Sequence, residues 1–397
     1  MTPTVGFGMT LYNNARHLPG TLESLLAQTD GDFGLVMVDD GSADGTEEVA
    51  RSYLALDRRL RYVRHETRRG MVPTWRDAFR LTRAEFRSAS CFAWASDHDW
   101  WHPEWLARVR AALDASPDNV LAYALTQRVD DDLRPLDKQP KTFDTTSLDS
   151  PSVRVLAFAA EPVGAGDMVY GLMRVDALER AGVFRRVIQP DRLLMVELAL
   201  AGRFAQVPEV LWLRRQPAEA SVGKQPTTLF AEGEAPRGLG LPAWIQHSRV
   251  LLGEYAVRGP AAPHLGSAGL LWLVVRYQAA YLIRHHSKGG YVLHRLDNAR
   301  ERVRLSWRQV GYQLRWAWYR AKTRWRPRHV ARITEKYALH VWRRAVYRVA
   351  VARRRMRAVA YEAGVALQRR YGLLRRGVRK AVYGLLLLTH RLGLRGK

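Results

Sequence analysis

The sequence has one cysteine, no long apolar run and, toward its end, almost no acidic residues. Cys91 stands alone among 397 residues, which excludes an intrachain disulfide and favours a reducing compartment. A membrane-spanning helix needs about 18 or more consecutive apolar residues, and no stretch reaches that length. The N-terminus lacks a basic segment followed by an apolar one, so we expect no secretory signal.

The acidic and basic residues are distributed very unevenly. Residues 281–397 contain 31 Lys+Arg against 4 Asp+Glu, a net charge of +27, whereas residues 1–280 contain 32 against 34, a net charge of −2. Such an asymmetry indicates two parts with different roles. We predict a near-neutral globular domain over residues 1–230 and a basic, mainly α-helical region over residues 231–397.

Apolar strands and amphipathic helices alternate along the first part of the chain. Strands are predicted at residues 5–12, 33–38, 59–65, 90–96 and 119–129. Helices are predicted between them at residues 18–28, 46–56, 72–82 and 103–113, the second opened by a capping box of Asp44 and Glu47. This order is typical of an α/β fold in which helices cover both faces of a parallel-rich mixed sheet.

Polar side chains lie at the carboxyl ends of these strands, where ligands gather in open α/β sheets. They are Thr10 and Tyr12 on the first strand, Asp39 and Asp40 after the second, Arg68 and Arg69 beyond the third, and Asp97, His98 and Asp99 after the fourth. Carboxylates this close together repel one another unless a cation lies among them. A hard divalent ion would satisfy them, so the sequence predicts a site for a metal-bound nucleotide diphosphate.

Three segments resemble motifs of family 2 glycosyltransferases, which have the GT-A fold. "MTLYNNARHLPGTLESLLAQTDGDFGLVMVDDGSADGT", residues 9–46, resembles the opening of that family, in which a strand ends in Asp-Asp-Gly-Ser. "SDHDWWHPEWL", residues 96–106, resembles its metal motif. "QPDRLLMVELALAGRFAQVPEVLWLRR", residues 189–215, resembles its catalytic-base segment. The segments follow one another in the family's order, which makes the resemblance more specific than one motif alone.

The resemblance implies a site for a nucleotide-linked sugar, most often one that carries uracil. Asp39 would accept a hydrogen bond from the base, and Asp40 would lie near the ribose. The predicted nucleotide contacts are Thr10, Tyr12, Asp39, Asp40, Arg69 and Asp97. Arg68 and Arg69 after the third strand, and Arg214 and Arg215 at the end of the third segment, suit a phosphate and the solvent equally well.

The resemblance also implies a metal ion and a general base. Asp99 is the best predicted ligand for Mn²⁺ or Mg²⁺, with Asp97 second and His98 a further candidate. Asp191 would take the proton of the acceptor hydroxyl while that oxygen attacks the anomeric carbon and inverts its configuration. The chain departs from the family in two places: the usual Asp-x-Asp-Asp is Ser-Asp-His-Asp at residues 96–99, and Pro190 replaces the usual Glu before the base.

The same carboxylates also fit purely structural roles. Asp39 and Asp40 suit a turn, Asp97 and Asp99 suit a helix N-terminus, and Asp191 suits an N-cap, which is compatible with a base role. Their positions at strand ends, within the family pattern, favour the functional interpretation.

The basic region is rich in aromatic residues, with five Trp and nine Tyr from residue 281 onward, whereas disordered tails are poor in them. Apolar residues recur between its arginines at rough helical spacing. Basic helices with Trp, Tyr and Leu on one side suit an anionic membrane surface, and nucleic acid is the electrostatic alternative. A helical bundle packed on the domain is a third possibility, and residues 240–285 fit it in part.

The sequence therefore predicts a metal-dependent inverting glycosyltransferase that moves a sugar from a donor, UDP-linked by preference, to a hydroxyl of a glycan or lipid-linked acceptor. The basic region would hold it on the cytoplasmic face of the cell membrane as a peripheral protein. The alternative is a nucleic-acid- or membrane-binding protein with a degenerate, inactive transferase domain. A nucleotidyltransferase is disfavoured, because no Gly-rich, basic loop follows the first strand to hold a nucleoside triphosphate. A dinucleotide-binding protein is disfavoured, because Gly6 and Gly8 are followed by Leu11 rather than a third glycine.

Overall fold

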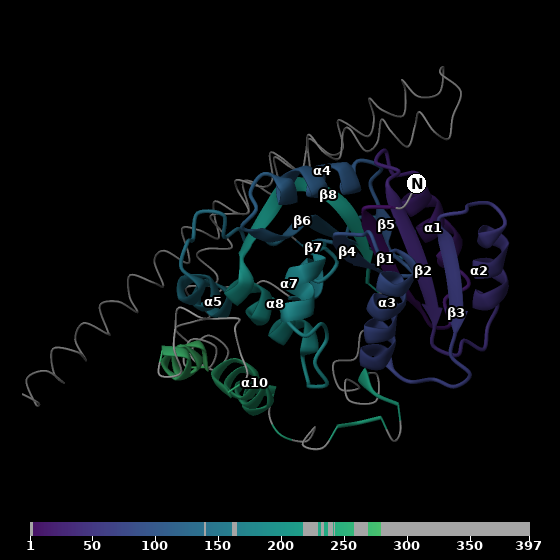
Figure 1. Cartoon of the computed structure of the whole chain (residues 1–397). Helices are drawn as coiled ribbons and strands as arrows, with labels where there is room; N and C mark the ends of the chain where they lie inside the picture. Colours follow the sequence, from purple (N-terminus) through teal and green to yellow (C-terminus); the bar gives the residue numbers. More distant parts are fainter. Residues whose placement is uncertain are drawn as a thin grey trace, which may run out of the picture. The chain divides into compact units, whose positions relative to one another are not determined.

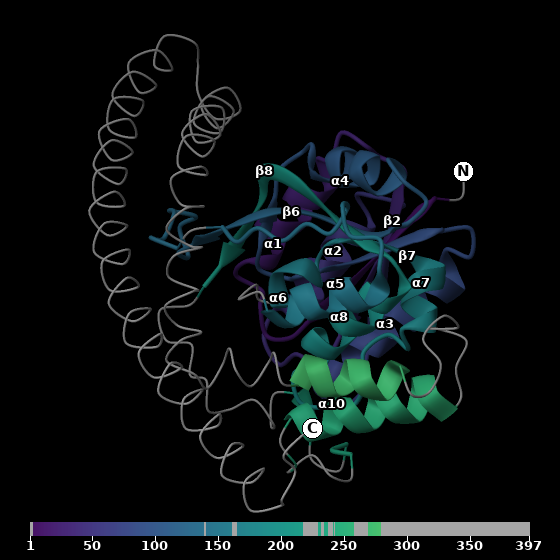
Figure 2. The same ribbon diagram turned by 90° about the vertical axis from the view of Figure 1, so that its left-hand side faces the viewer.

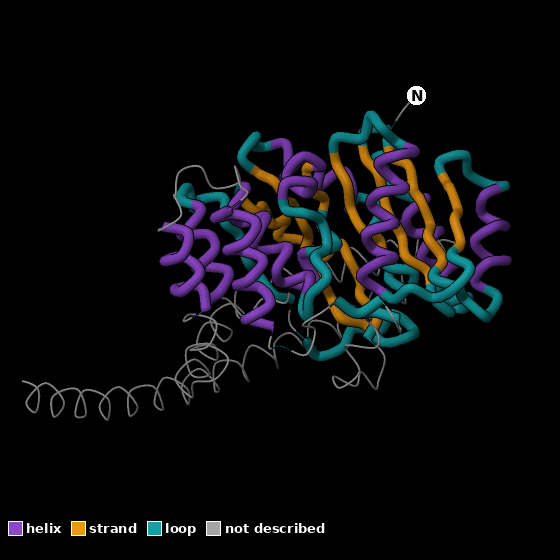
Figure 3. The backbone as a smooth tube through the Cα atoms, turned by 60° about the horizontal axis from the view of Figure 1, so that its bottom comes forward, coloured by secondary structure: helices purple, strands orange, loops and turns teal. Residues whose placement is uncertain are grey.

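The computed structural model describes residues 3–138, 140–160, 165–216, 229–231, 234–236, 241, 243–257 and 269–278. Eight strands form one mixed sheet in the order β3-β2-β1-β4-β7-β6-β8-β5, with helices on both sides of it (Figures 1 and 3). Neighbours β1–β2, β1–β4, β2–β3 and β6–β8 are parallel, and β4–β7, β6–β7 and β5–β8 are antiparallel. The predicted α/β fold with a mostly parallel mixed sheet is confirmed.

The bounds of the elements agree with the predicted strands and helices in the first part of the chain. The strands are β1 (Val5–Leu11), β2 (Phe33–Asp39), β3 (Leu60–Arg64), β4 (Cys91–Ala95), β5 (Trp100–Trp101), β6 (Asn119–Val129), β7 (Leu172–Arg174) and β8 (Arg203–Arg215). The helices are α1 (Leu18–Leu26), α2 (Thr46–Leu54), α3 (Met71–Glu85), α4 (Trp105–Asp114), α5 (Pro151–Ala160), α6 (Ala165–Met168), α7 (Val175–Arg180), α8 (Pro190–Ala201) and α10 (Ala243–Leu251). A π-helix, η2 (Leu252–Val257), continues α10, and residues 269–278 are also helical.

The two faces of β1 explain its Gly-x-Gly sequence. A Cβ at Gly8 would lie 2.9 Å from the Phe92 ring and 3.1 Å from the Ala78 backbone, so glycine lets α3 approach the sheet closely. Phe7, which points to the other face, packs against Phe33 and Trp105 with ring centroids 5.4 and 5.9 Å apart. These glycines therefore allow the helix to pack closely on the sheet. This role agrees with the absence of the third glycine that a dinucleotide-binding motif would have.

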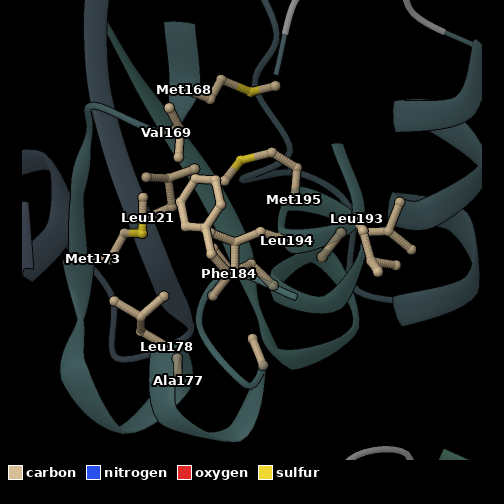
Figure 4. Packing of buried hydrophobic residues seen from close by; sticks show 14 of the residues in the cluster. Leu121, Met168, Val169, Met173, Ala177, Leu178, Phe184, Leu193, Leu194 and Met195 are labelled. Atoms are coloured by element: carbon tan, nitrogen blue, oxygen red, sulfur yellow. The ribbon is translucent and has the colours of Figure 1, made fainter. Parts of the chain in front are cut away.

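One large hydrophobic cluster covers the α3 side of the sheet. It joins α3, α5, α7 and α8 to strands β4, β6 and β7, and Figure 4 shows its central part around Phe184, Leu194 and Met195. Trp75 and Trp94 stack within it, with ring centroids 5.3 Å apart. The helix α8, whose first turn contains the predicted base Asp191, therefore lies on this side of the sheet.

The helical residues beyond β8 belong to the same core. Leu251 of α10 and Leu270, Leu273 and Tyr277 of the helix 269–278 are buried in the cluster, as expected for part of residues 240–285. The chain divides into two compact units, Met1–Ile283 and Arg284–Lys397. The predicted basic helices lie outside the described residues, and the boundary at residue 230 stays a prediction. Within the described ranges, no helix has both the length and the apolar character needed to cross a membrane.

Candidate functional site

The parallel strands bring the predicted site residues to one edge of the sheet. Leu11, Asp39 and Arg64 are register partners across β1, β2 and β3, and Met9 of β1 pairs with Ala95 of β4. The segments that follow these strands therefore leave the sheet side by side. They carry Tyr12, Asp40, Arg68, Arg69, Asp97, His98 and Asp99.

Asp39 is buried and bonded on both oxygens. Its Oδ1 accepts a hydrogen bond from the Ser42 amide at 2.7 Å, and its Oδ2 accepts one from the Tyr62 hydroxyl at 2.8 Å. Burial, together with this bond to Asp39, raises the pKa of Tyr62, so the phenol stays a donor. Arg64 lies 3.6 Å from Oδ2 and supplies a counter-charge. Asp39 therefore holds the turn after β2, and the base contact implied for it stays a prediction.

Asp40 fixes the loop that follows β3. It accepts hydrogen bonds from the amides of Arg69 at 2.7 Å and Gly70 at 2.9 Å, and lies 3.1 Å from Nδ1 of His65. Burial alone would raise the pKa of Asp40, but the bonds from His65 and from the loop amides lower it. Gly70 has a φ of +94°, and a Cβ there would lie 2.7 Å from the Phe230 Cα. Asp40 thus anchors a glycine that no other residue replaces without strain.

The predicted contacts on the outer side of this edge differ in exposure. Tyr12 is 43 % exposed, and the Arg68 guanidinium lies 4.7 Å from its ring centroid. Thr10 is half-buried. The Arg69 guanidinium pairs with Asp77 and lies 3.7 Å from Glu234, so its phosphate role stays a prediction. Tyr12 and Arg68 form a cationic, aromatic surface of the kind on which a base stacks.

Asp97 joins the ends of β1 and β4. Its Oδ2 accepts a hydrogen bond from the Tyr12 amide at 3.2 Å, and its Oδ1 accepts one from the Asn14 side chain at 3.0 Å. Nδ1 of His98 lies 2.7 Å from the same Oδ1. Although burial lowers it, the pKa of His98 is raised overall by this bond and by the charges of Asp99 and Asp97.

Asp99 is fully buried and incompletely bonded. Its Oδ1 accepts a hydrogen bond from the Arg215 amide at 2.8 Å and lies 3.9 Å from Nε2 of His98. Its Oδ2 has no hydrogen-bond partner within the described residues. Burial raises the pKa of Asp99, and His98 and Arg214 only partly offset this effect. A cation at Oδ2 would supply the charge that this carboxylate lacks.

The described residues contain no group of three or more His, Cys, Asp or Glu side chains arranged to hold a metal ion. The unpaired Oδ2 of Asp99 nevertheless fits a cation whose remaining ligands come from a diphosphate and water, as is usual for Mg²⁺. The oxygens of Asp97 are already bonded to protein donors. The metal-ligand roles of Asp99, Asp97 and His98 therefore stay predictions, and Asp99 is the one of the three with a buried oxygen that has no hydrogen-bond partner in the described structure.

Asp191 lies in the first turn of α8, where Gln189 rather than Asp191 is the N-cap. A Cβ placed on Gly166 would lie 3.5 Å both from Oδ2 of Asp191 and from Nη1 of Arg214, so the two side chains converge beside α6. Burial raises the pKa of Asp191, and Arg214 and Arg192 oppose the rise. A carboxylate with a raised pKa is better matched to proton transfer near neutral pH.

Other charged and aromatic residues lie beside Asp191. The sequence left a phosphate role and a solvated position open for Arg214, whereas it did not predict Arg128, Asp167, Tyr170 or Trp212. Nη1 of Arg214 donates to Oδ1 of Asp167 at 2.8 Å, and Arg128 pairs with the same oxygen at 2.5 Å. The Arg214 guanidinium lies 5.5 Å from the ring centroids of Tyr170 and Trp212. Arg128 could have been found, since it stands at the carboxyl end of the strand predicted at 119–129. Asp167 and Tyr170 lie in a segment without a motif.

Asp99 and Asp191 share one electrostatic environment. The charge of Arg214 lowers the pKa of both carboxyl groups, against the larger effect of burial. Burial raises the pKa of Tyr170, and the charges of Asp99 and Asp191 raise it further. Asp99 and Asp191 therefore interact with the same two side chains, Arg214 and Tyr170, at the sheet edge.

Residues 7–179 match the family described as Glycosyl transferase family 2. These residues are a family 2 glycosyltransferase domain. The domain covers the donor side of the site, from β1 to α7, while Asp191 and Arg214 lie beyond the matched range. The resemblance seen in the sequence is thereby confirmed.

Two curated relatives are similar to part of this chain. The protein named "Putative glycosyltransferase EpsH", from Bacillus subtilis (strain 168), is 28% identical over 124 residues, which cover 31% of this chain and 34% of EpsH. Glycosyltransferase GlyG of Streptococcus pneumoniae serotype 4 is 24% identical over 86 residues, 22% of this chain and 29% of GlyG. The chain thus spans about a third of the length of the curated relatives it matches.

Two solved structures are similar to this chain at low identity. TarS 1–349 of S. aureus, in complex with UDP-GlcNAc, has a TM-score of 0.49 and 15% identity, and the match covers 76% of this chain and 82% of TarS. The mannosyltransferase PcManGT of Pyrobaculum calidifontis, in complex with GDP-Man and Mn²⁺, has a TM-score of 0.40 and 17% identity, over 87% of this chain and 88% of PcManGT.

Proposed function

We propose that this protein is a GT-A-type inverting glycosyltransferase that moves a sugar from a nucleotide diphosphate donor to an acceptor hydroxyl. The observation that carries the proposal is the convergence of Asp99, with its unpaired oxygen, and Asp191, with its raised pKa, on one edge of the sheet. Asp99 lies within the family 2 domain, and Asp191 follows that domain in the sequence. Asp99, through a bound cation, suits the leaving diphosphate, and Asp191 suits the attacking hydroxyl.

The donor side is formed by the segments after β1, β2, β3 and β4. Tyr12 and Arg68 offer a stacking surface for a base, and Thr10 and Asp39 line the strand ends beside it. Asp99 would hold Mn²⁺ or Mg²⁺ through its free oxygen, with His98 beside it. Such an ion, when bound, offsets the negative charge that develops on the leaving diphosphate.

The acceptor side is formed by Asp191 and its neighbours. The Asp191 carboxylate would accept the proton of the acceptor hydroxyl while that oxygen bonds to the anomeric carbon and the bond from that carbon to the diphosphate breaks. Arg214, held by Asp167 and by two aromatic rings, keeps a fixed positive charge beside this step. Fixed charges of this kind stabilise a transition state without reorganising.

A donor screen tests the proposed activity. We expect the protein with Mn²⁺ to release UDP or GDP from one member of a panel of UDP-glucose, UDP-GlcNAc and GDP-mannose, since both nucleotides occur in the similar structures. Release should require the divalent ion. Salt-dependent nucleic-acid binding without any release of a nucleotide diphosphate would favour the inactive-domain alternative instead.

We further propose that the protein attaches to the cytoplasmic face of an anionic membrane and acts there on a lipid-linked or cell-envelope acceptor. The basic region from residue 281 onward supplies the charge, at about 1 kcal/mol for each basic residue that engages the surface. The described helices add an apolar face. Leu271, Trp272 and Val275 are exposed on the outer side of the helix 269–278, with Trp244 of α10 also exposed.

A fluorophore on this apolar face tests the attachment. Cys91 is buried, so Trp272→Cys would give one reactive thiol, and Leu56→Cys, on the catalytic domain, is the matched control. We expect the probe at residue 272 to shift to the blue with vesicles that contain phosphatidylglycerol, and the probe at residue 56 to stay unchanged. A protein that does not sediment with these vesicles would contradict the membrane proposal.

A further inference from the structure

The backbone just before the predicted base adopts an unusual conformation. Gln189 has φ +53° and ψ +55°, the left-handed region, and it is the N-cap of the helix whose first turn holds Asp191. A residue other than glycine is strained in this region and persists there only where its surroundings hold it. The direction of the Asp191 side chain depends on this turn.

Two adjacent residues of α10 hold the turn. The Gln246 side-chain oxygen accepts a hydrogen bond from the amide of Ile188 at 3.1 Å, and Nε2 of His247 donates to the Ile188 carbonyl at 2.8 Å. Both backbone groups of the residue before Gln189 are thus bonded to one helix. The Gln246 side chain is itself fixed by donation to the Leu241 carbonyl at 2.6 Å.

The chemistry of His247 suits a permanent donor. The imidazole is buried, and burial lowers its pKa to about 4. It is therefore neutral at ordinary pH, and because its partner is a carbonyl, Nε2 must carry the proton. A neutral, buried donor holds the carbonyl without placing a charge near Asp191.

The helix 269–278 completes the support. Nε of Arg192, the residue after the base, donates to the Tyr277 hydroxyl at 3.3 Å. The Gln278 side chain donates to the Trp244 carbonyl at 3.1 Å and to the Ser248 hydroxyl at 3.0 Å, so this helix also fastens α10. Figure 2 shows the two helices side by side beneath α8.

We propose that Gln246 and His247 are positioning residues for the general base. In this proposal α10 and the helix 269–278, together called the brace, fix the turn at Gln189 that precedes Asp191. The proposal rests on the proposed role of Asp191. The brace is distant in sequence from the donor site, whose residues lie on the segments after β1 to β4. Its loss should therefore change the rate of the chemical step and leave donor binding unchanged.

The test compares His247→Leu, which removes the donor, with His247→Gln, whose side-chain amide can reach the same carbonyl. With the donor panel above and water as the acceptor, we expect kcat to fall about a hundredfold in His247→Leu, as for a misplaced catalytic group, with KM nearly unchanged. His247→Gln should recover most of the lost rate. Arg249→Ala, an exposed change on the same helix, should match the wild type.

Hydrogen exchange supplies a readout that needs no substrate. The amides of residues 189–193 should exchange faster in His247→Leu than in His247→Gln, and Gln246→Leu should give the same increase if His247→Leu fails to fold. A His247→Leu protein with wild-type kcat and exchange, or equal losses in the Leu and Gln variants, would overturn the proposal. If Asp191→Asn kept full activity, the base assignment would fail whatever the brace does.

Discussion

Asp191→Asn is expected to lower kcat by about a thousandfold, because a positioned general base contributes about 10²–10⁴ to the rate. The amide keeps the shape of the side chain but cannot accept the proton of the acceptor hydroxyl. Asp191, in the first turn of α8, is proposed to contact the acceptor hydroxyl and not the nucleotide, so the dissociation constant for UDP should not change. Steady-state kinetics and calorimetric titration of the same protein measure both quantities.

The pH dependence of the rate gives a second signature of Asp191. Only the ionised carboxylate can act as a base, and burial raises its pKa above the ordinary value of about 3.9. The rate of the wild type should therefore fall as the pH drops through this raised pKa, at a higher pH than for an exposed Asp. The residual activity of Asp191→Asn should lack this acidic limb.

Asp176→Asn is the matched control, since its exposed carboxylate pairs only with Arg180 in the described structure and lies in α7, outside the site. It should retain wild-type kcat. If Asp191→Asn lost less than tenfold, another group would have to accept the proton, and the proposed mechanism would be wrong.

Asp99→Asn is expected to lower kcat/KM by about a hundredfold to a thousandfold, because a metal ion supplies several kcal/mol of charge stabilisation at the leaving group. Higher Mn²⁺ should recover little of the loss. Asp57→Asn, whose carboxylate pairs with Arg59 before β3, is a control remote from this edge. Kinetics at several Mn²⁺ concentrations distinguish lost metal binding from a general loss of activity.

Asp99→Asn is expected to lose activity without losing stability. The pKa of Asp99 is raised in the folded protein, so its ionised form opposes folding, and stability falls as the pH rises through the unfolded and folded pKa values. Without metal at neutral pH, Asp99→Asn should be at least as stable as the wild type in urea unfolding. A clear loss of stability would show that Asp99 is a structural group rather than a site for a cation.

The part of the candidate site at the ends of β1 to β4 could be predicted because it depends on local sequence patterns. Strands β1 to β4 are apolar runs, their parallel order places all their carboxyl ends together, and Asp39, Asp40, Asp97 and Asp99 follow directly. Even in this part of the chain, the predicted capping box of Asp44 and Glu47 was wrong. Gly45 caps α2, Asp44 bonds the Thr46 and Ala15 amides, and Glu47 pairs with Arg51.

The acceptor half depends on contacts that no local pattern contains. Strand β7 has only three residues, Leu172–Arg174, yet it reverses direction and separates β4 from β6. The ion pairs of Asp167 with Arg128 and Arg214 join residues that are distant in sequence. The contact of His247 with Ile188 likewise spans 59 positions. Such pairs follow from the topology and not from periodicity.

The most direct test of the account is a calorimetric titration of UDP into the purified protein, with and without Mn²⁺, repeated with Asp99→Ala. We expect binding that requires Mn²⁺ and that Asp99→Ala loses, since in the described part of the chain Oδ2 of Asp99 is a buried carboxylate oxygen without a hydrogen-bond partner. If UDP, GDP and TDP all failed to bind under any metal, the acidic edge would be turn chemistry, and the protein would not be a sugar-nucleotide transferase.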